Sequence, residues 1–291
     1  MTLHAALIQP FIEFGFMRRA LVACLALALS CGPVGTLLVL RRMSLVGDAM
    51  AHALLPGAAL AFIVAGLSLT AMSIGAFLAA MLVAALAGGV TRWTSQREDA
   101  SFAAFYLIAL AAGVMLISVR GNSVDLMHVL FGSILAVDDA ALLLVAAVSS
   151  ATLGVLALVY RPLLVECFDP GILRSVGGRG GSVHQLFLVL LVANLVAGFQ
   201  TLGTLMAVGL LMLPAIAARF WANDVARLSA IATGFAVLSG FGGLLLSYHA
   251  ALPSGPAIVL VAGAIYLASL LLGSRDSLRS RFFTSGRHRI A

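Results

Sequence analysis

Two ionisable side chains, Asp48 and His52, lie four residues apart in a short stretch between long apolar segments. On a helix this spacing places both side chains on one face. Pro56 has no N–H to donate to the carbonyl of His52, so one backbone oxygen is freed on the same face. A carboxylate, an imidazole and a carbonyl oxygen are suitable ligands for a hard to borderline divalent cation. The alternative is an acid and a histidine that hydrogen-bond each other to close the start of a helix.

The composition is typical of a polytopic membrane protein. The chain of 291 residues is 62% hydrophobic and 10% charged, and its mean hydropathy is +1.13. A membrane-spanning helix needs roughly 20 apolar residues, so the apolar segments predict an all-α polytopic membrane protein with about eight or nine transmembrane helices. We expect a single domain over residues 1–291. The expected apolar segments are residues 20–40, 46–67, 70–91, 101–119, 138–160, 183–199, 202–218, 228–247 and 256–273.

The basic residues predict the orientation of the chain. All 17 are arginine, and without lysine there can be no GxxxxGK[ST] loop, which excludes a P-loop ATPase. If every segment crosses the membrane once, fourteen arginines lie on one side, in alternate joints between the segments or in the tail at 274–291. Only three, Arg18, Arg19 and Arg120, lie on the other side. This asymmetry predicts that the arginine-rich side and the C-terminus are cytoplasmic. The net charge of +6 is then explained without nucleic acid as a partner. Arg18 and Arg19, ahead of the first segment, argue by themselves for a cytoplasmic N-terminus, which would require one re-entrant segment.

The joint at residues 161–182 is the longest one on the predicted cytoplasmic side. Asp169 can cap a helix, Pro170 suits the first helical position, and Gly177 can end the helix. These signals predict a short helix at about 170–176. Such a helix is suited to docking a soluble partner, and an ordinary structured loop is the alternative.

Five blocks of sequence resemble the membrane permease of the zinc/manganese/iron(II) family of ATP-binding-cassette importers. The resemblance covers residues 17–273. The blocks, in chain order, are LRRMSLVGDAMAHALLPG at 40–57, LFGSIL at 130–135, the segment from Phe168 to Gly177 that begins FDP, LGTLMAVGLLMLPAIAAR at 202–219, and LLSYHAALPSGPAIVL at 245–260.

The resemblance implies the permease of a type II importer, with the fold of the vitamin B12 importer. It implies a homodimer in a bacterial inner membrane, with cytoplasmic ATPase subunits and a periplasmic or extracellular metal-binding protein as partners. The chain itself would not be an enzyme. The family's metal-site motif falls on Asp48 and His52, and its ATPase-contacting loop on Phe168, Asp169, Pro170 and Gly177. The residues after the FDP segment, from Gly171 to Leu173, depart from the acidic residue and alanine that we consider typical of the family.

The expected cargo is a divalent transition metal, with zinc first and manganese or iron(II) next. No cysteine or methionine lies on the row of Asp48 and His52, which argues against copper(I). We expect no covalently bound cofactor. The alternative function is a proton- or sodium-coupled carrier that works without an ATPase, with Asp48 and His52 as a proton relay. An intramembrane metalloenzyme is disfavoured because the H-E-x-x-H pattern is missing.

Overall fold

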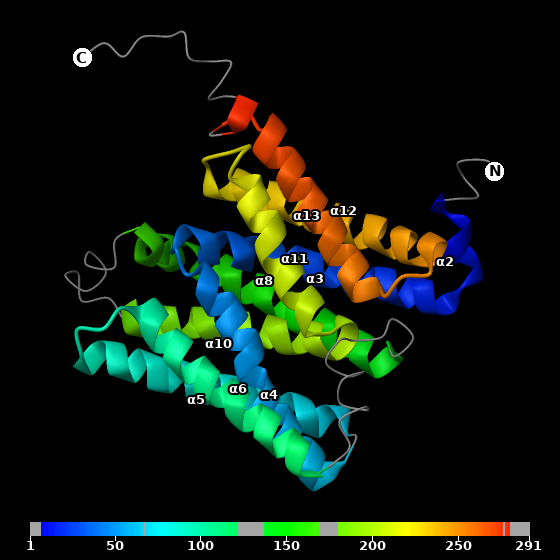
Figure 1. The fold of residues 1–291 in the computed structure, drawn as a ribbon. Coiled ribbons are helices and arrows are strands. Elements are labelled where there is room, and N and C mark those ends of the chain that lie inside the picture. The colour runs from blue at the N-terminus through cyan, green and yellow to red at the C-terminus, as the bar shows by residue number, and fades with distance from the viewer. Residues whose placement is uncertain (1–6, 67, 121–136, 169–179, 276, 280–291) are drawn as a thin grey trace, which may run out of the picture.

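The regular structure of the chain is helical throughout the described residues (Figure 1), which confirms the predicted all-α fold. The computed structural model describes residues 7–66, 68–120, 137–168, 180–275 and 277–279. The helices are α2 (Gln9–Glu13), α3 (Gly15–Leu40), α4 (Ser44–Ala65), α5 (Leu69–Trp93), α6 (Glu98–Arg120), α8 (Asp139–Phe168), α10 (Gly180–Leu202), α11 (Thr204–Ala218), α12 (Val225–Ala250) and α13 (Ser254–Leu272).

Each expected apolar segment corresponds to one helix. Among the described residues, 8 helices are long and apolar enough to cross a membrane. The ninth segment is α11, which is apolar but has only 15 residues. Helix α3 is the most deeply buried of the eight, and it contacts α8, α10, α11 and α12. The polytopic membrane architecture predicted from composition is therefore confirmed.

The predicted end of the segment at 138–160 is wrong. Helix α8 continues past Pro162 to Phe168, with a kink marked by the non-helical backbone of Val159 (φ −105°, ψ 17°). Proline removes one backbone hydrogen bond and bends a helix, but the following turn is held because Leu163 is fully buried. The joint that was predicted to begin at residue 161 therefore begins after Phe168, and the predicted helix at 170–176 lies outside the described residues.

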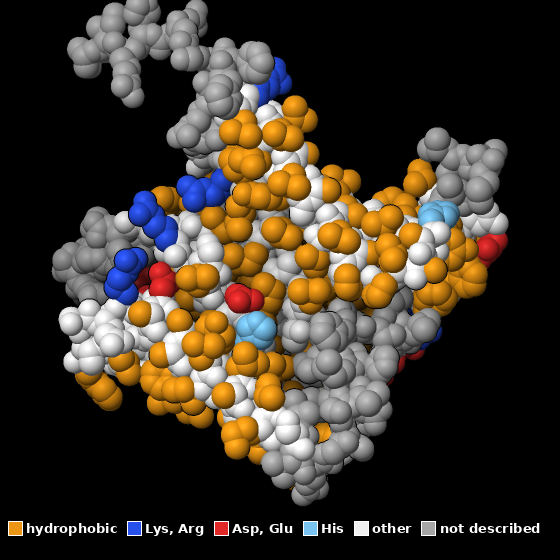
Figure 2. Space-filling model, in the orientation of Figure 1, with side chains coloured by type: hydrophobic (Ala, Val, Ile, Leu, Met, Phe, Trp, Pro, Cys, Tyr) orange, Lys and Arg blue, Asp and Glu red, His pale blue; other side chains and the backbone are white. Residues whose placement is uncertain are grey.

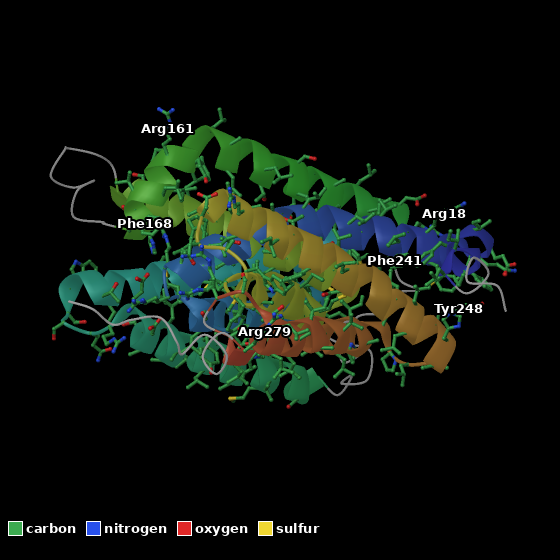
Figure 3. All side chains as sticks on the ribbon, turned by 90° about the horizontal axis from the view of Figure 1, so that it is seen from above. Arg18, Arg161, Phe168, Phe241, Tyr248 and Arg279 are labelled. Carbon is green, nitrogen blue, oxygen red and sulfur yellow. The ribbon has the colours of Figure 1, made fainter. Side chains whose placement is uncertain are left out.

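The helices run between two opposite ends of the molecule. Arg161 and Phe168 lie at one end, and Arg18 and Tyr248 at the other (Figure 3). A cytoplasmic N-terminus would require one re-entrant segment, for which the second segment is the first candidate. That segment is α4, a continuous helix of 22 residues that is long and apolar enough to cross a membrane. Several contacts join different helices where their ends meet. They are the ion pair Arg19–Asp139, the hydrogen bonds Gln200–Leu69, Arg41–His184 and Arg275–Phe220, and the ring contact Phe14–Tyr248.

Helices α4, α5 and α6 form a group that is distinct from the rest of the bundle (Figure 1). Helix α4 packs mainly on α5 and α6, whereas α3 packs mainly on α12, α8 and α11. Although α3 and α4 are consecutive in the chain, they make few contacts with each other. The short turn at residues 41–43 therefore leads from one helix group to the other.

Glycines allow α4 and α5 to approach closely. A Cβ added at Gly75 would lie against the carbonyl oxygen of Gly57 and 2.9 Å from the Cβ of Ala61. A Cβ added at Gly57 would in turn meet the carbonyl oxygen of Gly75. In lipid, where no hydrophobic force draws helices together, such close backbone contact supplies much of the packing energy. The crossing lies next to Pro56 and so fixes the middle of α4.

We expect Gly75→Ala to lower the free energy of unfolding by about 1–3 kcal/mol, the usual cost of overpacking. Gly88→Ala is the matched control in the same helix, because a Cβ at Gly88 has nothing within 4 Å. The control should be neutral or stabilising by up to about 1 kcal/mol, since alanine is the better helix former. Thermal unfolding of both variants in detergent micelles measures the difference. Equal midpoints for the two would contradict the close crossing.

Candidate metal site

Asp48 and His52 lie side by side on α4, as their spacing predicted. Nε2 of His52 is 3.7 Å from Oδ1 of Asp48. The side chains are exposed, at 55% for Asp48 and 42% for His52. In Figure 2 an acidic side chain and a histidine adjoin near the centre of a face that is otherwise largely hydrophobic. The two potential ligands are therefore together and accessible.

The opposite face of α4 is buried and holds the pair in place. Val46, Ala49 and Met50 are at most 2% exposed. A Cβ added at Gly47 would lie 2.9 Å from Cδ2 of Leu38 and 3.3 Å from Sδ of Met212, so α4 approaches neighbouring helices closely just before Asp48. This packing fixes the rotation of α4, and that rotation turns Asp48 and His52 outward.

Helix α6 contributes a side chain that the sequence did not single out. The ring of Tyr106 is stacked on His52, with centroids 6.0 Å apart and an interplanar angle of 25°. The two residues are 54 positions apart in the chain, so no local spacing rule could have paired them. Stacking restricts the orientation of the imidazole, which helps to keep Nε2 directed toward Asp48.

Pro56 lies inside α4 one turn after His52, and the helix continues past it to Ala65. Since proline cannot donate, the carbonyl of His52 lacks its usual donor four residues on. Helix α6 fits against this point, because a Cβ added at Gly113 would lie 3.1 Å from the nitrogen of Pro56. The local sequence thus supplies a third potential ligand, a backbone oxygen, beside the acid and the imidazole.

One protomer does not complete a metal site from side chains. Over the described part of the chain, no group of three or more histidine, cysteine, aspartate and glutamate residues is gathered closely enough to hold a metal ion. A divalent cation bound by Asp48 and His52 would need further ligands from a second molecule, water or backbone oxygens.

The predicted docking loop is described only at its first residue. Phe168 ends α8 with 69% of its surface exposed, at the same end of the bundle as Arg161 (Figure 3). Asp169, Pro170 and Gly177 lie outside the described residues. A set of polar contacts that the sequence did not predict lies close by, where Arg41, Cys167 and His184 meet.

Comparison with known proteins agrees with the resemblance noted in the sequence. The family model described as the ABC 3 transport family matches residues 13–273. The manganese import system permease protein ScaB of Streptococcus parasanguinis is 35% identical over 264 residues, which are 91% of this chain and 93% of that protein. The manganese transport system membrane protein MntC of Halalkalibacterium halodurans is 31% identical over 280 residues, 96% of this chain and 94% of that protein.

A solved structure has the same fold. The structure titled PsaBC from Streptococcus pneumoniae in complex with Fab matches with a TM-score of 0.83 and 31% sequence identity, and the match covers 97% of this chain and 99% of that one. At this identity and coverage the likeness extends over the whole helical bundle, including α4.

Proposed function

The chain belongs to the ABC 3 transport family, and we propose that it is the permease subunit of an importer that carries manganese across a bacterial inner membrane. The observation that supports this most directly is the pair of Asp48 and His52, held 3.7 Å apart on a helix long and apolar enough to span the membrane. Ionisable side chains at membrane depth are costly, and they mark ion pathways more often than structural contacts.

Manganese replaces zinc as the preferred cargo. Carboxylate and imidazole nitrogen suit manganese, zinc and iron(II) alike, so the ligands alone gave only a slight preference for zinc. The two relatives described above are named for manganese import and manganese transport. The carbonyl freed by Pro56 adds an oxygen ligand, which suits manganese better than zinc.

We propose that the site is completed by a second copy of the chain. The exposed pair would face acyl chains in a lone protomer, at a cost of roughly 2.5–3.5 kcal/mol for a charged side chain on insertion scales. A two-fold axis beside α4 would remove this cost and supply two carboxylates and two imidazoles, enough ligands for one ion. In this arrangement the metal enters from the end that carries Arg18 and Tyr248 and leaves toward the end with Arg161.

The energy source is a separate ATPase. The chain has no lysine and hence no P-loop of its own. The ATPase would dock at the segment from Phe168 to Gly177, on the arginine-rich end that we assign to the cytoplasm with the C-terminus. An extracytoplasmic metal-binding protein would deliver the ion to the other end. The family match favours this ATP-driven importer over a proton- or sodium-coupled carrier.

Removing either ligand should abolish uptake. We expect Asp48→Asn and His52→Ala to weaken manganese binding by more than the roughly 10–100-fold that loss of an outer-shell partner costs. Asp99→Asn is the control, because it removes the same charge from another helix. Manganese binding to the purified permease and uptake into cells, at equal amounts of membrane protein, measure the effect. Uptake at the wild-type rate in both variants would remove the site assignment.

The choice of metal is tested by competition. Cells that produce the importer receive radioactive manganese together with equal concentrations of zinc or iron(II), and metal accumulation is compared with that of cells carrying Asp48→Asn. We expect manganese to accumulate in preference, at a rate that depends on Asp48. Accumulation of zinc in its place would restore zinc as the cargo.

The docking segment is tested by co-purification. Asp169→Ala and Pro170→Ala should lower recovery of the ATPase with the tagged permease, since they remove the predicted helix cap and first residue. Manganese binding by the permease should be unchanged, because neither residue is near α4 in the sequence. Ser175→Ala is the control within the same segment. Full recovery of the ATPase with both variants would place the docking surface elsewhere.

A further inference from the structure

A chain of polar contacts joins three helices at the end that we assign to the cytoplasm. Nη1 of Arg41 is 2.9 Å from Nδ1 of His184, and Nε2 of His184 is 3.1 Å from Oε1 of Glu98. Arg41 follows the last residue of α3, His184 lies in the first turns of α10, and Glu98 begins α6. The residues are far apart in sequence, and the fold brings them together.

The hydrogen bonds in this chain have a defined direction. Arginine carries only donors, so Nδ1 of His184 must accept from Arg41. In the neutral imidazole the proton is then on Nε2, which donates to the carboxylate of Glu98. The order is thus guanidinium, neutral imidazole, carboxylate. A metal ion is disfavoured at this point, because Arg41 brings a fixed positive charge to the imidazole and the carboxylate that would bind it.

Arg41 also contacts both helices that flank the proposed docking segment. Its Nε donates to Sγ of Cys167 at 3.3 Å, one residue before the end of α8. Its guanidinium carbon lies 4.7 Å from the ring centroid of Phe187, one turn after His184 on α10. A cation over an aromatic ring is attracted by the ring quadrupole. Arg41 therefore contacts the last turn of α8 and the first turns of α10 at the same time.

The turn that follows Arg41 connects Arg41 rigidly to the start of α4. The N–H of Met43 bonds the carbonyl of Leu38 at 3.1 Å, and the N–H of Arg42 bonds that of Val39 at 3.1 Å. These two bonds form a Schellman motif, in which Arg42 takes the left-handed position (φ 57°). Helix α4 then starts at Ser44. Asp48 lies only about 6 Å beyond Ser44 at helical rise.

Glu98 provides the second route to the metal site. It begins α6, which packs on α4 and contributes Tyr106, the residue stacked on His52. His184 thus connects α10 to both supports of the site: to α4 through Arg41 and the turn, and to α6 through Glu98. Gln200 donates to the carbonyl of Leu69 at the opposite end, so the two helix groups are tied at each end.

Arg41 and Glu166 each have one buried side-chain atom with unmet hydrogen-bonding capacity. Within the described part of the chain, Nη2 of Arg41 and Oε2 of Glu166 have no hydrogen-bond partner. Glu166 is adjacent in the chain to Cys167, which contacts Arg41. An unpaired buried polar atom destabilises the arrangement that contains it.

We propose that Arg41, His184 and Glu98 form a linkage that couples the ends of α8 and α10 to α4 and α6, and so couples ATP hydrolysis to the release of metal from Asp48 and His52. The proposal rests on the proposed function, because it takes α8 and α10 as the flanks of the ATPase docking segment. In this role the three residues are positioning residues, and none of them is a metal ligand.

The test uses the permease co-purified with its ATPase in lipid vesicles. We expect His184→Leu to lower manganese-stimulated ATP hydrolysis and manganese uptake roughly tenfold, the order set by loss of one hydrogen bond to a charged group. His184→Gln should restore coupling, because its amide both accepts from Arg41 and donates to Glu98. Leucine fills a similar volume without these contacts, so a packing role alone would not separate the two variants.

Matched controls separate the linkage from general effects of charge. Arg41→Gln and Glu98→Gln, each alone, should uncouple ATP hydrolysis from manganese uptake as His184→Leu does. The double variant with both Arg41→Gln and Glu98→Gln should lose no more coupling than either single variant. Arg161→Gln and Asp99→Asn remove the same charges without altering the linkage or the turn, since Arg161 is exposed at the same end of the bundle (Figure 3), and they should leave coupling unchanged. Binding of manganese to the permease should be the same in all variants, since none alters Asp48 or His52.

The outcomes distinguish this proposal from the proposed function. If the wild type binds manganese and His184→Leu still couples ATP hydrolysis to uptake at the wild-type level, the linkage is overturned. The proposed function then stands. A fall in manganese binding equal to the fall in ATP hydrolysis also overturns it, because the residues would then shape the site statically. A wild-type complex that neither binds manganese nor responds to it overturns the proposed function and the linkage with it.

Discussion

A carboxylate and an imidazole on the open face of a membrane-spanning helix are the constraint that the rest of the structure must meet. Asp48 and His52 are exposed, while the other face of α4 is buried against neighbouring helices. Hydrocarbon does not solvate ionised groups, so the exposed face requires a partner with polar groups. The proposed second copy would meet that requirement, because symmetry would turn an incomplete set of two ligands into a set of four.

Precise placement of the pair depends on backbone contacts more than on side chains. Gly47 allows α4 to lie against Leu38 and Met212, and Gly57 allows it to cross α5 at the backbone of Gly75. Both contacts are within three turns of His52, so α4 has little freedom to rotate or slide locally. Movement of the site then requires movement of α4 together with α5 and α6, the helices on which it packs.

The sequence predicted the local features and missed the distant ones. The pairing of Asp48 with His52 follows from a spacing of four residues, and the spans follow from runs of apolar residues, because helical geometry determines both. The contact of Arg41 with His184 joins residues 143 positions apart, which no periodicity encodes. The end of α8 was misplaced because the polar joint was predicted to begin at residue 161, whereas α8 continues through Pro162 and burial of Leu163 holds the turn beyond it. The ligands alone could not decide the metal, because the same ligands suit several cations.

The turn between α3 and α4 shows how one short segment can serve two requirements. A left-handed residue at the end of a helix is usually glycine, and a residue with a side chain costs roughly 1–2 kcal/mol there. Arg42 nevertheless occupies that position, with φ 57°, next to Arg41 at the arginine-rich end of the bundle. This second arginine adds to the charge asymmetry from which we infer the orientation of the chain in the membrane. The same turn holds Arg41 against α8 and α10. In the proposed importer, it therefore ties the helix that carries Asp48 and His52 to the end that we assign to ATPase docking.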